Sequence, residues 1–123
     1  MKSMNEWVIY HNAKCSKSRE TLQILKDQGV TPKVVSYLEE VPSEEKLREI
    51  LKKLKLSAKD IVRTKEEEFK KAKVDLTDED SVIKLLIKNP ILIERPIVTR
   101  GNHAVIGRPP ENVLDLIKEK KDA

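Results

Sequence analysis

The sequence predicts an α/β fold in which a four-stranded mixed sheet receives a helical insertion between its second and third strands. Three observations predict it. The chain opens with an apolar run, an amphipathic stretch and a second apolar run, an order typical of a βαβ unit. Residues 39–89 show helical periodicity and no good strand pattern. Two short β-branched runs and an amphipathic stretch close the chain, which indicates a hairpin followed by a helix.

The βαβ unit is well marked. Residues 7–10 are apolar and rich in aromatic and β-branched side chains, which is typical of a buried strand. Residues 16–28 have helical periodicity, and Gly29 stands where a helix would end. Residues 33–37 form the second predicted strand, which we expect to run parallel to the first because a helix connects them.

The insertion begins with an amphipathic helix. Ser43 is its predicted N-cap and is followed by acidic residues in the first turn. Apolar side chains then recur at helical spacing, at Leu47, Ile50, Leu51 and Leu54. Residues 57–62 indicate another short helix. Thr77 and Asp80 have the spacing of a capping box, which predicts the start of the last helix in the insertion.

The remaining strands come from the C-terminal part of the chain. Asn89 and Pro90 end the insertion. Residues 97–99 and 104–106 flank a turn signal, which predicts an antiparallel hairpin. Residues 111–121 predict a final helix. This order of elements is that of a thioredoxin-like fold with helices inserted before the hairpin.

The length and composition fit one domain. We expect a single thioredoxin-like domain over residues 1–123, with residues 39–89 as an inserted helical subdomain. The 25 Lys and Arg residues and the 21 Asp and Glu residues are mixed along the chain, so we expect no direct nucleic-acid binding. The small positive excess of +4 is compatible with an anionic ligand. Because the sequence has no signal peptide and no long apolar run, we expect a cytoplasmic protein without membrane association.

The single cysteine, Cys15, lies between the first predicted strand and the first predicted helix. A thiol at a helix N-terminus faces free backbone N–H groups, which favour the nucleophilic thiolate. Lys14, Lys17 and Arg19 add nearby positive charge. The same N–H groups can hold a phosphate-like anion. The position therefore predicts a nucleophile beside an oxyanion site, with an ordinary buried cysteine as the alternative.

Three motifs follow one another along the chain: residues 9–12 with Cys15, Ser18, Arg19, Thr21 and Leu22, then residues 89–98, and then residues 106–109. Together they span nearly the whole chain. In order and separation they resemble the motifs of the arsenate reductase family of the glutaredoxin-dependent type, within the arsenate reductase/Spx-like superfamily.

The resemblance implies roles around the thiol. Cys15 corresponds to the nucleophile that attacks arsenic and forms a covalent thiol–arsenate adduct. His11 and Ser18 correspond to residues that tune this thiol. The alternatives are a strand-end histidine with a structural role and an ordinary first-turn serine.

The resemblance also implies an oxyanion cradle. Arg63, Arg95 and Arg108 correspond to the arginines that surround the substrate, and a guanidinium fork suits a tetrahedral oxyanion. Periodicity alone indicates that Arg63 is exposed, and structural ion pairs are the alternative for the other two arginines. Pro96 corresponds to the proline that faces the active thiol in thioredoxin-like proteins, and we expect its peptide bond to be cis.

A single cysteine constrains any redox mechanism. Ser18 occupies the position of the second cysteine in a Cys-x-x-Cys motif, so an external thiol must resolve an adduct on Cys15. This agrees with the resemblance, which implies glutathione as the thiol co-substrate and glutaredoxin as the partner. We expect arsenate or a similar oxyanion as substrate, no bound cofactor, no metal, and a monomer.

Two other functions stay open. Spx-like regulators share this fold and bind RNA polymerase. Their redox-switching members use a Cys-x-x-Cys pair, which this chain lacks because Ser18 stands at the second cysteine position. A related thiol oxidoreductase with another substrate is the second alternative. A Cys-x5-Arg phosphatase loop is excluded because position 21 is Thr21.

Overall fold

A computed structural model of the chain describes residues 6–119. These residues divide into two compact units. The first unit, here called the sheet unit, comprises residues 6–37 and 95–119. The second, here called the helical unit, comprises residues 38–94.

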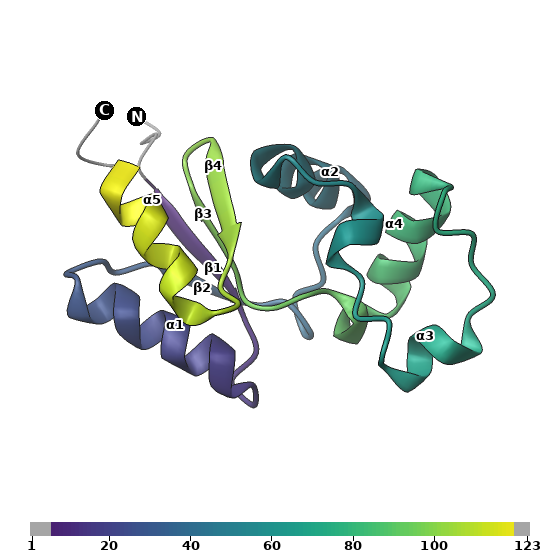
Figure 1. Cartoon of the computed structure of the whole chain (residues 1–123), viewed down its shortest axis with the longest axis horizontal. Helices are drawn as coiled ribbons and strands as arrows, with labels where there is room; N and C mark the ends of the chain where they lie inside the picture. Colours follow the sequence, from purple (N-terminus) through teal and green to yellow (C-terminus); the bar gives the residue numbers. More distant parts are fainter. Residues whose placement is uncertain (1–5, 120–123) are drawn as a thin grey trace. The chain divides into compact units, whose positions relative to one another are not determined.

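The sheet unit contains a four-stranded mixed sheet, as the sequence predicts (Figure 1). Its strands are β1 (Trp7–His11), β2 (Lys33–Ser36), β3 (Ile97–Arg100) and β4 (His103–Ile106). Their order across the sheet is β2-β1-β3-β4. Strands β1 and β2 are parallel, whereas β1 with β3 and β3 with β4 are antiparallel. The predicted α/β class and thioredoxin-like arrangement are therefore confirmed.

Two helices cover one face of this sheet (Figure 1). Helix α1 (Ser16–Asp27) follows β1, and α5 (Val113–Glu119) follows the short 3-10 helix η3 (Pro110–Asn112). Alternate residues of β1 point to the helices because side chains of a strand alternate between its faces. The core formed there contains Trp7, Ile9, Leu25, Val30, Val98, Val113 and Leu116. Gly29, with φ of +79°, ends the turn after α1 in a conformation that favours glycine.

The helical unit contains no strand within its described residues and is built from short helices. They are α2 (Glu44–Leu54), η1 (Ala58–Ile61), α3 (Glu67–Lys71), α4 (Glu79–Lys88) and η2 (Pro90–Leu92). Val62 and Ile93 pair as an isolated antiparallel bridge. The buried apolar side chains of this unit include Leu47, Ile50, Ile61, Val82, Ile83 and Leu86.

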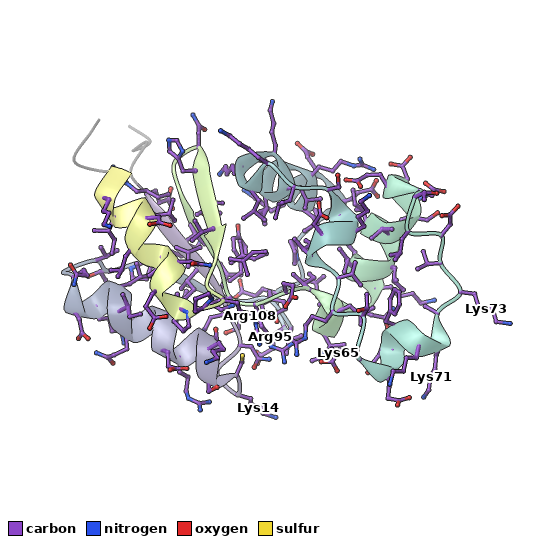
Figure 2. The ribbon with its side chains drawn as sticks, in the orientation of Figure 1. Lys14, Lys65, Lys71, Lys73, Arg95 and Arg108 are labelled. Atoms are coloured by element: carbon purple, nitrogen blue, oxygen red, sulfur yellow. The ribbon has the colours of Figure 1, made fainter. Side chains whose placement is uncertain are left out.

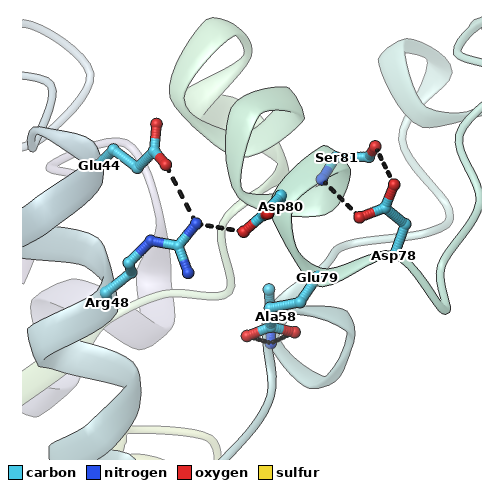
Figure 3. Close-up of polar contacts among 7 residues, drawn as sticks. All are labelled: Glu44, Arg48, Ala58, Asp78, Glu79, Asp80 and Ser81. Atoms are coloured by element: carbon cyan, nitrogen blue, oxygen red, sulfur yellow. Dashed lines mark hydrogen bonds and ion pairs between the residues drawn. The ribbon is translucent and has the colours of Figure 1, made fainter.

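Polar contacts join the ends of these helices (Figure 3). Ser43 caps α2 as predicted, since its side chain accepts a hydrogen bond from the Lys46 N–H. Arg48 of α2 donates to Glu44 and to Asp80, which links α2 to the start of α4. The Ala58 N–H is held by both carboxylate oxygens of Glu79, each at 3.1 Å.

The predicted boundaries need two corrections. Thr77 does not cap α4: its hydroxyl donates to Asp75, and the N-cap is Asp78, which accepts from the Ser81 N–H. The final helix begins as 3-10 helix η3 and becomes α-helical only at Val113. Its predicted last residues, 120–121, lie outside the described range. None of the helices between residues 6 and 119 is long and apolar enough to cross a membrane.

Candidate functional site

Cys15 is the N-cap residue of α1 and is nearly buried, with 9% of its surface exposed. Its backbone is extended, so the helix begins at the next residue and leaves its first N–H groups without helical partners. The turn that leads to it is closed by Asn12, whose carbonyl accepts from the Cys15 N–H at 2.9 Å. The Asn12 side chain also accepts from the Lys14 N–H at 3.0 Å. This local folding fixes the thiol at the helix N-terminus.

The pKa of Cys15 is lowered by its surroundings. Burial would raise the pKa of this thiol, but hydrogen bonds to the sulfur outweigh burial. The donors are the backbone N–H of Ser18, the guanidinium of Arg95 and the backbone N–H of Lys17. Because each donor stabilises the charged form, the arrangement favours the thiolate.

Arg95 and Arg108 lie close together (Figure 2). Both contact the Cys15 thiol. The Nε of Arg108 donates to the carbonyl oxygen of Arg95 at 2.8 Å. The Nη2 of Arg108 lies 3.7 Å from the Cys15 sulfur. The structure therefore brings two of the three predicted arginines together with the predicted nucleophile.

The β3–β4 hairpin explains why these arginines meet. Ile97 pairs with Ile106, so the residues before β3 and after β4 leave the sheet at the same end. The Gly107 N–H continues the contact by donating to the Pro96 carbonyl at 2.8 Å. The Arg95–Pro96 peptide bond is cis, and so is the Arg108–Pro109 bond, which no sequence pattern predicts.

His11 and Ser18 form a buried pair below the thiol-bearing turn. The Oγ of Ser18 lies 2.7 Å from the Nδ1 of His11 and accepts from the Asn12 N–H at 3.1 Å. Burial, with the positive charges of Arg19 and Lys26, lowers the pKa of His11. The imidazole is therefore neutral at neutral pH, so any effect of His11 on Cys15 comes from position and hydrogen bonding and not from an imidazolium charge.

Arg63 belongs to the helical unit, so its place relative to Cys15 stays a prediction. Within that unit its Nε pairs with Glu66 at 3.1 Å and its Nη1 with Glu94 at 3.4 Å. Its side chain is 21% exposed, so the periodicity argument for an exposed residue was wrong. The two carboxylates fix the direction of this guanidinium.

Tyr37 is a site neighbour that sequence reasoning treated only as the end of a strand. It lies directly after β2 and is buried, with 1% exposed. Its hydroxyl interacts with the Arg95 guanidinium. A tyrosine at the end of a predicted strand could have indicated a nearby polar group, because a buried phenol hydroxyl requires a hydrogen-bonding partner.

The assembled groups suit attack on an oxyanion. A thiolate stands where helix N–H groups and two guanidinium groups converge, and all of these are donors that bind negatively charged oxygen. Across residues 6–119, no three His, Cys, Asp or Glu side chains come together as potential metal ligands. The thiolate with its surrounding donors offers nucleophilic attack by sulfur with electrostatic stabilisation.

The chain is similar to known proteins over most of its length. The family described as ArsC family matches residues 10–116. An Escherichia coli K12 protein named uncharacterized protein YfgD is 47% identical over 114 residues, covering 89% of this chain and 94% of that protein. A Haemophilus influenzae protein named arsenate reductase is 42% identical, covering 89% and 97%. The solved structure of an arsenate reductase from Vibrio cholerae has a TM-score of 0.83 and 43% identity, covering 90% and 97%.

Proposed function

Because the chain belongs to the ArsC family, we propose that it reduces arsenate to arsenite through a covalent adduct on Cys15. The observation that carries the proposal is the thiol of Cys15 at the N-terminus of α1, where Arg95 and Arg108 both contact it. Several similar proteins bear the name arsenate reductase, including those of Haemophilus influenzae and Vibrio cholerae. The substrate class follows from a nucleophile set among oxyanion donors.

The reaction begins with attack of the Cys15 thiolate on arsenic. A sulfur–arsenic bond forms, and one arsenate oxygen takes up protons and leaves as water. A glutathione thiolate then attacks the Cys15 sulfur and forms a mixed disulfide. The sulfur–arsenic bond breaks, and its electron pair remains on arsenic, which leaves as trivalent arsenite. Glutaredoxin removes glutathione from the mixed disulfide, and a second glutathione restores glutaredoxin.

The external thiols are required by the sequence. The chain contains one cysteine, so no second sulfur of its own can resolve the adduct. Ser18 fills the position of a resolving cysteine, and its hydroxyl is already engaged with His11. We therefore propose glutathione as co-substrate and glutaredoxin as partner of a cytoplasmic monomer that uses no bound cofactor.

The arginines of the site have two different roles: one stabilises the nucleophile and the others bind the substrate. Arg95 contacts the sulfur directly and stabilises the thiolate. Arg108 reaches the sulfur at 3.7 Å and is otherwise exposed, so it is suited to bind an incoming oxygen. Arg63 is the proposed third ligand of the oxyanion. Such donors stabilise the charge on the arsenate oxygens as the new bond forms.

The test is an arsenate-dependent assay of glutathione oxidation with glutaredoxin present. The native chain is expected to turn over, and Cys15→Ser is expected to abolish turnover. Arg48→Met is the matched control, because Arg48 is an exposed arginine whose partners lie on α2 and α4 of the helical unit. A folded native chain without arsenate-dependent turnover would refute the proposal. RNA polymerase binding and other thiol substrates would then be tested.

A further inference from the structure

Asn112 clamps the loop that carries Arg108. Its Nδ2 donates to the Ile106 carbonyl at 3.2 Å and to the Arg108 carbonyl at 3.0 Å. Its own N–H donates to the Pro109 carbonyl at 3.0 Å. One side chain on η3 thus holds the backbone on both sides of Gly107.

The clamp fixes the point from which the Arg108 side chain extends. From there Nε donates to the Arg95 carbonyl at 2.8 Å, and Nη2 approaches the Cys15 sulfur at 3.7 Å. Arg108 is exposed, and an exposed arginine loses side-chain rotamer entropy when it is held in one conformation. A rigid backbone leaves the guanidinium fewer alternative positions, so less conformational entropy is lost when the side chain is ordered.

The carboxamide is chemically suited to this task. It offers two N–H donors from one nitrogen, so it can hold two carbonyl oxygens at once. An aspartate of the same shape would place carboxylate oxygens against those carbonyls and could donate to neither. On another side of the loop, Thr21 of α1 approaches the Gly107 carbonyl at 3.4 Å. The Arg108 loop is therefore hydrogen-bonded to η3 and packed against Thr21 of α1, whose hydroxyl donates mainly to the Lys17 carbonyl at 2.8 Å.

We infer that Asn112 is a positioning residue that orients Arg108 toward Cys15 and the substrate oxyanion. Its effect on the orientation of Arg108 follows from the hydrogen bonds alone. Its effect on catalysis rests on the proposed function. The two are therefore measured separately.

The orientation is tested by NMR of the Arg108 Nε–H group, whose signal is assigned by its loss in Arg108→Lys. In the native chain this proton is expected to be shifted from the position of a disordered arginine and to exchange slowly. In Asn112→Ala and in the shape-matched Asn112→Asp, its exchange is expected to accelerate by about fivefold or more, the ratio typical of one lost hydrogen bond. Asn89→Ala is the matched control, because the Asn89 amide also donates to a carbonyl, that of Leu85 in the helical unit.

Each result decides the inference. An unchanged Arg108 signal in folded Asn112 variants would overturn it, as would a native chain in which the signal resembles a disordered arginine. Unfolding of both Asn112 variants would also overturn it, because the amide would then support the whole unit and not one side chain. An equal change in Asn89→Ala would have the same meaning.

The catalytic consequence is measured as arsenate turnover. Asn112→Ala is expected to raise KM for arsenate about threefold to tenfold with little change in kcat, and to have no further effect in an Arg108→Ala background. Equal effects in both backgrounds would contradict positioning through Arg108. A native chain that shows the ordered Arg108 signal but no arsenate turnover would refute the proposed function and leave the positioning role intact.

Discussion

The Arg95 guanidinium hydrogen-bonds to the Cys15 thiol, although the two residues come from distant parts of the chain. Cys15 is placed by the local turn after β1. Arg95 is placed by strand β3, which pairs with β1 on one side and with β4 on the other. The reactivity of the thiol therefore depends on the assembled sheet as well as on the helix N-terminus.

Replacing Arg95 is expected to make the thiol less reactive at neutral pH. Arg95→Met removes a donor that stabilises the thiolate, so the pKa of Cys15 rises and its alkylation profile moves to higher pH. Iodoacetamide labelling of Cys15 across a pH series measures this shift. Arg48→Met, in the helical unit, is expected to leave the profile unchanged. An unchanged profile in Arg95→Met would show that Arg95 does not contribute to the thiol pKa.

The low pKa of His11 predicts a loss of stability in mild acid. Burial and the charges of Arg19 and Lys26 keep the folded imidazole neutral, while in the unfolded chain it takes up a proton near its ordinary pKa of 6.5. The unfolded state then binds more protons, so the free energy of unfolding falls as the pH drops below about 6.5. Urea unfolding at several pH values measures this slope. His11→Gln is expected to flatten it, and an equally steep slope in that variant would assign the effect to other groups.

Much of the site could be predicted because its core is local. His11, Cys15 and Ser18 lie within one strand–turn–helix segment, and the helix start after Cys15 could be recognised from the chain. The hairpin between Arg95 and Arg108 was also recognisable, although only the family resemblance implied a role for the two arginines. Local periodicity and turn signals therefore predict contacts between residues that lie in the same strand–turn–helix segment or in the same hairpin.

Other features depend on tertiary packing and had no local signal. Tyr37 and Arg95 interact only because β2 is placed in the same sheet unit as the hairpin. Asn112 lies in a short 3-10 helix, where no periodic pattern shows which way its amide points. The spacing of Thr77 and Asp80 predicts a capping box at Thr77, but Asp78 is an equally good capping residue, and the Asp75 carboxylate engages the threonine in the folded chain.

Removing the Ser18 hydroxyl is expected to destabilise the fold. Ser18 is fully buried, and its Oγ satisfies both the Asn12 N–H and the His11 Nδ1. Ser18→Ala leaves these buried groups without that partner, so we expect a loss of about 1–3 kcal/mol in the free energy of unfolding, measured in urea. Ser16→Ala, at an exposed serine in the same turn, is expected to change it by less than about 0.5 kcal/mol. Equal effects of the two substitutions would contradict the role of the buried pair.

Arg100 is expected to tie α5 to the sheet through Trp7. Its side chain is 4% exposed, lies 5.6 Å from the centroid of the Trp7 ring, and donates to the Leu116 carbonyl at 3.2 Å. Arg100→Met keeps much of the volume but loses the charge and the donor, so we expect about 1–3 kcal/mol lower stability. Trp7 is the only tryptophan, so its fluorescence reports the change directly. If Arg100→Met had the same urea midpoint and the same Trp7 emission as the native chain, packing alone would hold α5.

Gly107 leaves no room for a side chain where α1 meets the Arg108 loop. A Cβ at this position would lie 2.5 Å from Thr21 Oγ1, 2.9 Å from Pro96 Cγ and 3.0 Å from Thr21 Cγ2. Gly107→Ala must therefore displace Thr21 or the loop, and we expect it to lower the free energy of unfolding by about 1–3 kcal/mol. It is also expected to raise KM for arsenate, because the displaced loop carries Arg108.

The source of this cost is tested by a double-mutant cycle with Thr21→Ala, which removes two of the three close atoms. We expect Gly107→Ala to cost less in the Thr21→Ala background, so that the two substitutions are not additive. Gly29→Ala is the control: its new Cβ would meet no atom within 4 Å, and its cost of about 1–2 kcal/mol comes from the φ of +79°. That cost is expected to be the same in both backgrounds. Additive effects of Gly107→Ala and Thr21→Ala would show that the loop, and not Thr21, yields to the added methyl group.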